Sequence, residues 1–380
     1  MIRNRIHEMT LMYSLFSKCR DRVFSGKPIS LVLTMLIAAC LPAHAIGTEM
    51  ESQPDTLTIA MTGDIMMGTT FPSVMLPAND GADLFRDVAP ILSAAHLAVG
   101  NLEGTLIDGG KSAKGTGPNT YAFRTPTSYA HRLTEAGYDF LSQANNHARD
   151  FGEEGILSTE HVLDSIGIKY SGIQGRADHA VIERDGVRYG ICAFGHNTYT
   201  YKTQDTATVR RILQELRPEC DVLIVSFHGG AEGRAHAHLP QGTETFLGEN
   251  RGSLRQFAHF CVDLGADLIY GHGPHVTRAV ELYKGHFIAY SLGNFCTPFG
   301  MSLAGISAYA PVVTVRIARD GGRFIDGRIH SFIQQKGIGP RTDNTHAVAH
   351  EMRQLTTADF ATPSISISDE GVMNVSPATE

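Results

Sequence analysis

Cysteine is scarce in this chain of 380 residues, which contains only six. Four of them lie beyond residue 45: Cys192, Cys220, Cys261 and Cys296. Cys192 lies within an apolar strand-like segment, and Cys261 lies on the apolar face of a helix-like one. We therefore expect buried, reduced thiols and no disulfide framework.

The sequence also lacks a low-complexity block, an internal repeat and an excess of positive charge. Hydrophobic residues make up 42% of it, which is enough for a substantial core in one large domain or two intimate ones. It contains 32 Lys and Arg residues and 39 Asp and Glu residues, which gives a formal net charge of −7. A negative surface argues against nucleic acid as a partner.

The apolar run at 30–40 is too short to span a bilayer comfortably. It follows a basic segment, and this order is typical of a secretory signal. Two ways of processing residues 1–45 remain open: cleavage after Ala45, or lipidation of Cys40 behind a lipobox-like Ile37-Ala-Ala. Cleavage is favoured because Pro42 and its small neighbours resemble an ordinary cleavage region. The sequence thus predicts an exported protein of the periplasm or cell envelope, lipid-anchored through Cys40 in the second case.

Apolar periodicity predicts alternating strands and helices first, and mainly strands later. The expected strands are 57–61, 96–99, 138–142, 180–182, 187–194, 222–227, 268–270, 278–283, 286–291, 312–317 and 323–332. The expected helices are 84–95, 128–136, 152–166, 207–216 and 253–264. This order favours an α/β fold with two sheets packed face to face and helices outside. We expect one domain at 46–335 and a peripheral extension at 336–380, in which 364–368 is a candidate edge strand.

Metal-type side chains follow several of these strands. The stretch 265–276 is the clearest case, because glycines and Pro274 turn the chain sharply after a short buried strand and present His272 and His275 together. Chemistry in open α/β sheets gathers at the C-terminal ends of strands. Imidazole pairs on rigid turns suit a divalent metal. The other strand-end groups of this type are Asp64, Glu103, Asn146, His147 and His228.

As an ordered set, these groups resemble the CapA family of capsule and poly-gamma-glutamate synthesis proteins, whose domain is similar to the calcineurin-like metallophosphoesterases. The motifs are Gly63-Asp64, Gly100-Asn101-Leu-Glu103, Asn145-Asn146-His147, His228 to Glu232, His272-Gly-Pro-His275 and Asn294. Two positions depart from the commoner family pattern. Gly229 to Gly233 replace an aromatic-containing His-Trp-Gly-x-Glu-Tyr, and Gly273 replaces the second of two adjacent histidines.

The resemblance implies a four-layer α/β/β/α sandwich with two divalent metal ions, whether Mn, Fe, Zn or Co. It implies that Asp64 binds one metal and that Glu103 is the bridging carboxylate. The remaining implied ligands are Asn146, His228, His272 and His275. His147 is implied as the proton donor.

Several further residues are candidates for substrate binding or for support of the ligands: Asn101, Asn145, Glu232, Arg251, Arg278 and Asn294. Arg251 and Arg278 are interpreted either as anion clamps or as members of salt bridges. Asp150 is interpreted as the cap of the helix that begins near Gly152.

Two functions follow as hypotheses. The first is an exported metal-dependent hydrolase of phosphoester or phosphodiester bonds in a cell-surface polymer or its phosphorylated precursor. The second is a non-catalytic accessory protein that binds an anionic capsular polymer or a membrane synthase. Since the protein surface is acidic, the second function needs a local positive patch to attract an anionic polymer.

Overall fold

The computed structural model describes residues 56–115 and 120–377. These residues belong to one compact unit, 53–380. The predicted signal segment, 1–45, lies outside the described residues. Within the described part of the chain, no helix is long and apolar enough to cross a membrane.

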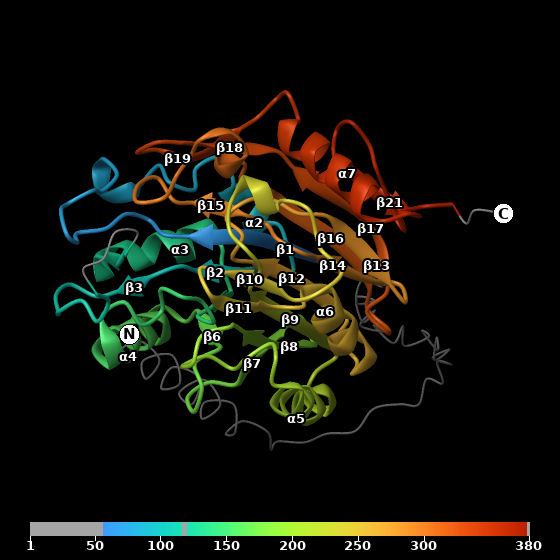
Figure 1. Cartoon of the computed structure of the whole chain (residues 1–380), viewed down its shortest axis with the longest axis horizontal. Helices are drawn as coiled ribbons and strands as arrows, with labels where there is room; N and C mark the ends of the chain where they lie inside the picture. Colours follow the sequence, from blue (N-terminus) through green and yellow to red (C-terminus); the bar gives the residue numbers. More distant parts are fainter. Residues whose placement is uncertain (1–55, 116–119, 378–380) are drawn as a thin grey trace, which may run out of the picture. The chain divides into compact units, whose positions relative to one another are not determined.

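Two large sheets form the centre of this unit (Figure 1). The nine-stranded sheet has the order β20-β21-β17-β16-β1-β2-β5-β6, with β15 paired to β1. Its strands are β1 (Thr56–Ile65), β2 (Leu97–Leu102), β5 (Phe140–Ser142), β6 (Lys169–Ser171), β15 (Asn294–Cys296), β16 (Val312–Ala318), β17 (Phe324–His330), β20 (Ile365–Ile367) and β21 (Val372–Val375). The six-stranded sheet has the order β13-β14-β12-β9-β8-β7. Its strands are β7 (His179–Arg184), β8 (Val187–Phe194), β9 (Val222–His228), β12 (Leu268–His272), β13 (Val280–Tyr283) and β14 (His286–Ala289).

The two sheets pack face to face because alternate apolar residues of their strands point into a shared core. In β1, Ile59 and Met61 join this core, whereas Ala60 faces the other way. In β12, Tyr270 lies in the same core and Ile269 faces outward. Strands buried on both faces are apolar throughout, as is usual for sheets covered on both sides.

Helices cover the outer face of each sheet. Apolar residues of α2 (Ala89–Ser93), α3 (His131–Ala136) and α4 (Gly152–Ile166) pack on the nine-stranded sheet. Those of α5 (Thr206–Leu216) and α6 (Leu254–Asp263) pack on the six-stranded sheet. The fold is therefore a four-layer α/β/β/α sandwich, as predicted.

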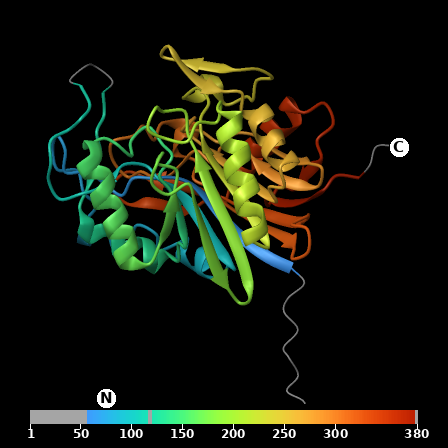
Figure 2. The same ribbon diagram turned by 90° about the horizontal axis from the view of Figure 1, so that it is seen from below.

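Short ribbons complete the unit: β3 (Thr105–Leu106) pairs with β4 (Arg124–Thr125), β10 (Glu244–Phe246) with β11 (Glu249–Gly252), and β18 (Phe332–Gln335) with β19 (Gly339–Thr342). The β10–β11 hairpin projects from the body of the described unit (Figure 2). The predicted helix at 84–95 is shortened to α2, and 128–136 divides into a 3-10 turn and α3. All four cysteines beyond residue 45 are free and buried, which confirms the expectation for Cys192 and Cys261.

The prediction of a peripheral extension after residue 335 is wrong. Residues of α7 (Ala347–Asp359), β20 and β21 contribute apolar side chains to the core between the sheets. Figure 1 shows α7 beside β17 and β21 at this end of the sheet. The expected strand near 364–368 is present as β20, at the edge of the nine-stranded sheet. The segment is thus part of the domain, since removing it would expose this core.

Ile365→Val tests this integration. Ile365 is 2% exposed, so loss of one buried methyl group is expected to reduce the free energy of unfolding by about 0.5–1.5 kcal/mol. Ile325→Val, in the same sheet at a residue 37% exposed, is the matched control and should have a smaller effect. Denaturant titration measures both, and equal effects would contradict the integration of this segment.

Candidate metal centre

The parallel strands of both sheets end at the same place, and their last residues carry the predicted ligands. Asp64 is the second-to-last residue of β1, and its register partner in β2 is Asn101. In the other sheet, His272 of β12 is paired with His228 of β9. The sheets are joined nearby by a hydrogen bond from the Tyr270 hydroxyl to the Gly100 carbonyl oxygen, 3.2 Å long. The two strand-end groups therefore face each other.

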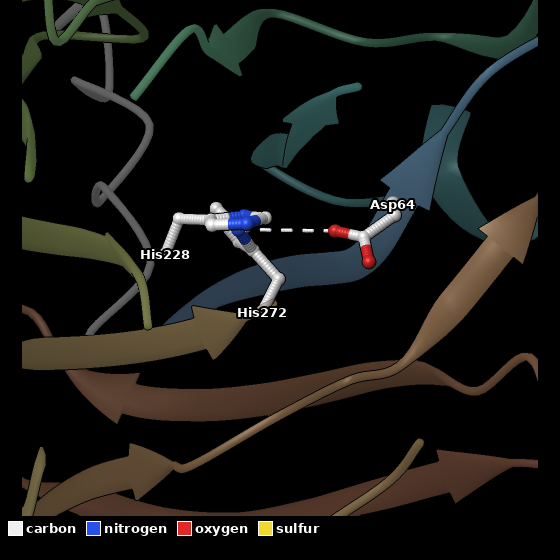
Figure 3. A group of neighbouring side chains, drawn as sticks. All are labelled: Asp64, His228 and His272. Atoms are coloured by element: carbon white, nitrogen blue, oxygen red, sulfur yellow. Dashed lines mark hydrogen bonds and ion pairs between the residues drawn. The ribbon is translucent and has the colours of Figure 1, made fainter. Parts of the chain in front are cut away.

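Asp64, His228 and His272 form the centre of this group. One ligand-type atom from each lies within 4.8 Å of the others, and all three side chains are buried. Figure 3 shows both imidazoles beside the Asp64 carboxylate. The Nδ1 atoms of His228 and His272 are 2.9 Å apart, and His272 Nδ1 lies 3.8 Å from Asp64 Oδ1. Burial lowers the pKa of His228 well below its usual range and that of His272 to about 4, so both rings are neutral near pH 7 and competent as ligands.

Glu103 adds a second buried carboxylate between the two groups. Its Oε2 lies 3.6 Å from His228 Nδ1, and its Oε1 lies 4.0 Å from His147 Nε2. Burial, and after it the charge of Asp64, raise the pKa of Glu103 well above its usual range. This rise means that the two carboxylates need a nearby positive charge to be ionised together.

His275 supplies positive charge on the Asp64 side. Its Nδ1 lies 2.9 Å from Asp64 Oδ2 and 3.1 Å from Asn294 Oδ1. Burial acts to lower the pKa of His275, but the hydrogen bond to Asp64 and the charges of Asp64 and Glu103 outweigh burial and raise it to about 9. A cation is therefore favoured at this position in the cluster.

The residues present fit divalent metal ions. Among the proposed ligands, three buried atoms have no hydrogen-bond partner in the described part of the chain: Glu103 Oε1, Asn146 Oδ1 and His228 Nε2. An unsatisfied buried polar atom costs about 1–3 kcal/mol. All three carry lone pairs, and carboxylate, amide and imidazole donors without thiolate suit Mn, Fe, Zn or Co.

Asparagine side chains hold the carboxylates in place. Asn101 Nδ2 donates to Asp64 Oδ1 at 2.8 Å and to Glu103 Oε2 at 2.6 Å. Asn145 Nδ2 donates in turn to Asn101 Oδ1 at 3.0 Å. The Ser226 hydroxyl lies 3.0 Å from His272 Nε2 and orients that ring. Supporting contacts of this kind fix the direction of metal ligands.

His147 is held by an acid on one side and faces the cluster on the other. Its Nδ1 lies 2.9 Å from Asp150 Oδ2, and its ring packs 4.4 Å from that of Phe123. Lys114 Nζ lies 2.8 Å from Asp150 Oδ1. Burial lowers the pKa of His147, and the charge of Asp150 opposes this. The Nε2 atom is left to face Glu103.

The interpretation of Asp150 as a helix cap is wrong. The N-cap residue of α4 is Phe151, without a side-chain cap bond. The Asp150 carboxylate instead accepts from the Phe123 amide at 2.6 Å and contacts His147. Sequence reasoning also missed Lys114, Ser226 and Tyr199, the last of which donates its hydroxyl to the Asn145 carbonyl oxygen. The sequence does offer one indication of the contact between His147 and Asp150. They are three residues apart, and a turn brings residues at that spacing together.

The arginines take different positions. Arg251 lies on the wall of a cleft of about 1,040 Å³ that Asn146, His147, His275, Asn294 and Glu232 also line. Its guanidinium donates to Glu232 Oε1 at 2.9 Å and lies 3.0 Å from Glu249 Oε2.

Arg278 is fully buried and lies outside the lining of this cleft. Its two Nη atoms donate to the two carboxylate oxygens of Glu244 at 2.8 and 2.7 Å. It also donates to the Ala231 carbonyl oxygen at 3.2 Å. The structure therefore favours the salt-bridge interpretation of Arg278, in which it supports the loop after β9.

The two departures from the family pattern lie against each other. Gly273 has φ 115°, and a Cβ atom there would come within 2.8 Å of the Gly229 carbonyl oxygen. The Gly229 amide donates to the His272 carbonyl oxygen at 3.0 Å. The ends of β9 and β12 approach this closely because residue 273 has no side chain.

A four-layer sandwich with carboxylate, amide and imidazole groups at facing strand ends defines an α/β/β/α protein with a candidate metal site. Within this class, the chain belongs to the bacterial capsule synthesis protein family PGA_cap, whose model matches residues 58–298. The resemblance to CapA proteins is thereby confirmed.

Two CapA proteins and two solved structures illustrate what this chain is similar to. The PGA biosynthesis protein CapA of Bacillus subtilis is 28% identical, with 81% of this chain and 80% of the relative covered. The capsule biosynthesis protein CapA of Bacillus anthracis is 27% identical, with 76% and 72% covered. The calcineurin-like phosphoesterase YfkN from Bacillus subtilis is 14% identical and covers 80% of this chain and 97% of its own, at a TM-score of 0.40. A phosphatase from Mycoplasma pneumoniae is 14% identical and covers 76% and 95%, at a TM-score of 0.48.

Proposed function

We propose that this protein is a two-metal hydrolase of phosphoester or phosphodiester bonds that acts in capsule or poly-gamma-glutamate biosynthesis. The observation that carries the proposal is the buried ligand set, in which Glu103, Asn146 and His228 keep unpartnered lone-pair atoms. Such atoms are costly in a folded core unless a ligand satisfies them. Membership in the PGA_cap family supports the biosynthetic setting.

The residues divide into two groups about Glu103. Asp64 and His275 would hold one ion, which would replace the proton that His275 carries at its raised pKa. Asn146, His228 and His272 would hold the other, with Glu103 between them. Two divalent cations, when bound, supply positive charge for the phosphoryl oxygens and acidify the attacking water. Asn101 and Asn145 keep the carboxylates oriented through the hydrogen bonds described above.

His147 would act as the general acid. Its Nδ1 is held by Asp150, so the proton available to a substrate is on Nε2, the atom that faces the cluster. As the bond between phosphorus and the leaving oxygen breaks, this proton moves to the leaving oxygen. The charge of Asp150 stabilises the protonated ring that this step requires.

Turnover assays test the proposal. The full exported chain, loaded with Mn, Fe, Zn or Co, is offered a panel of phosphomonoesters and phosphodiesters, and metal-dependent hydrolysis of at least one class is expected. Full metal content without turnover on any ester would contradict it. That outcome would support an accessory protein that binds an anionic cell-surface polymer or a membrane synthase.

We also propose that the protein is exported to the periplasm or cell envelope. The support is the basic segment followed by the apolar run in residues 1–45. N-terminal sequencing of protein from the producing cells is expected to begin after Ala45. A blocked, lipidated start at Cys40 would replace that cleavage site, and a start at Met1 would contradict export through this segment.

A further inference from the structure

Arg149 lies on the wall of the cleft, two residues after His147, together with Tyr199. Its guanidinium carbon is 6.0 Å from the centre of the Tyr199 ring. The residue is exposed, and among the described residues no carboxylate forms an ion pair with it. Its N–H donors are therefore directed at solvent or at a ligand in the cleft.

The other long cationic side chains of the cleft wall are already neutralised. Lys114 is paired with Asp150 at 2.8 Å. Arg251 contacts both Glu232 and Glu249, so its side of the cleft carries a net negative charge. An anionic substrate group is repelled there and attracted to Arg149, because charges of opposite sign across a cleft orient a charged ligand.

Tyr199 connects the position of Arg149 to the candidate metal centre through a hydrogen bond. Its hydroxyl donates to the Asn145 carbonyl oxygen at 3.1 Å, and Asn145 directly precedes the proposed ligand Asn146. At 6.0 Å, the Arg149 guanidinium is at the outer limit of a cation–π contact with the Tyr199 ring, and its fork of donors stays free for a ligand. Arg149 is thus held on the same loop as His147, the residue that faces the leaving oxygen.

We propose that Arg149 and Tyr199 form a subsite that binds an oxyanion, carboxylate or phosphate, on the leaving-group side of the substrate. A guanidinium binds either group through two parallel N–H bonds. The leaving-group assignment rests on the proposed function, whereas the anion subsite itself rests on the cleft wall. This subsite would select substrates whose leaving group carries a further acidic group.

Equilibrium binding tests the subsite without turnover. Isothermal titration of the full, metal-loaded chain uses a glutamic acid trimer, O-phosphoserine and, as the neutral reference, a glutamine trimer. Arg149→Gln is expected to raise the Kd of at least one anionic probe about tenfold, the loss expected for a charged hydrogen bond, with little effect on the glutamine trimer. The probe that loses more affinity identifies carboxylate or phosphate as the preferred group.

Arg210→Gln is the matched control. Arg210 is also exposed and stacked on an aromatic ring, 5.1 Å from the centre of Phe260, but it lies on α5 outside the cleft. Equal Kd values for wild type and Arg149→Gln with both anionic probes would overturn the subsite, and so would equal losses in the two variants.

Kinetics separates this inference from the proposed function. Two esters are compared that differ only in a carboxylate on the leaving group. The kcat/KM of the acidic ester divided by that of the neutral ester is expected to fall about tenfold in Arg149→Gln, mainly because the KM of the acidic ester rises. An unchanged ratio in an active enzyme would overturn the leaving-group placement. No turnover in any variant would refute the hydrolase, and the binding result would still decide the subsite.

Discussion

His147→Ala is expected to reduce turnover of a phosphoester with a poor leaving group by about 10²–10⁴-fold, the usual contribution of a positioned proton donor. The reason is that His147 Nε2 faces the cluster while Asp150 holds Nδ1 at 2.9 Å. An activated ester, whose leaving group needs little protonation, should lose much less. Steady-state turnover on both esters measures the difference.

Metal content distinguishes a proton donor from a ligand. His147→Ala should retain metal near the wild-type amount, whereas Asn146→Ala, the matched neighbour, should lose metal because its Oδ1 is a proposed ligand. Elemental analysis of both variants is the measurement. If His147→Ala lost metal and was impaired equally on both esters, His147 would be a ligand, and the assignment of roles would be wrong.

Asp64→Asn is expected to lower metal affinity by more than the 10–100-fold that is typical for loss of a supporting residue. Asp64 contacts His275 at 2.9 Å and accepts from Asn101 at 2.8 Å, so its charge acts at the centre of the cluster. Titration of metal-stripped protein with Mn or Zn measures the change in Kd.

Two further variants serve as comparisons for Asp64→Asn. Asn101→Ala removes only the hydrogen bonds to the two carboxylates and should fall within the 10–100-fold range. Asp320→Asn, at an exposed residue, should bind metal as the wild type does. Wild-type affinity in Asp64→Asn would show that the metal, if bound, lies elsewhere.

Much of the central fold could be predicted because its elements are apolar over their whole length or on one clear face. The predicted helix 152–166 and strand 187–194 match α4 and β8 residue for residue. The C-terminal segment could not be predicted in the same way. Its apolar residues are few, and α7 is stabilised by packing on distant strands more than by its own sequence pattern.

Some contacts of the candidate site could likewise be predicted from the sequence, and others could not. Strand-end residues of one sheet, such as His228 and His272, could be predicted to meet, because neighbouring parallel strands end at one edge of a sheet. The partner of Arg278 could not, since Glu244 is 34 residues away in the sequence. The contact of Asp150 with His147 depends on the turn before α4, which hydrophobic periodicity does not describe.

A diffraction experiment on crystals loaded with Mn and soaked in phosphate tests the central claim most directly. Anomalous scattering should locate two ions about 3.5–4 Å apart, the spacing of two-metal hydrolytic sites. One ion should contact Asp64 and His275, the other Asn146, His228 and His272, with Glu103 between them and phosphate against both. A single ion, or ions bound away from these residues, would contradict a two-metal hydrolytic centre.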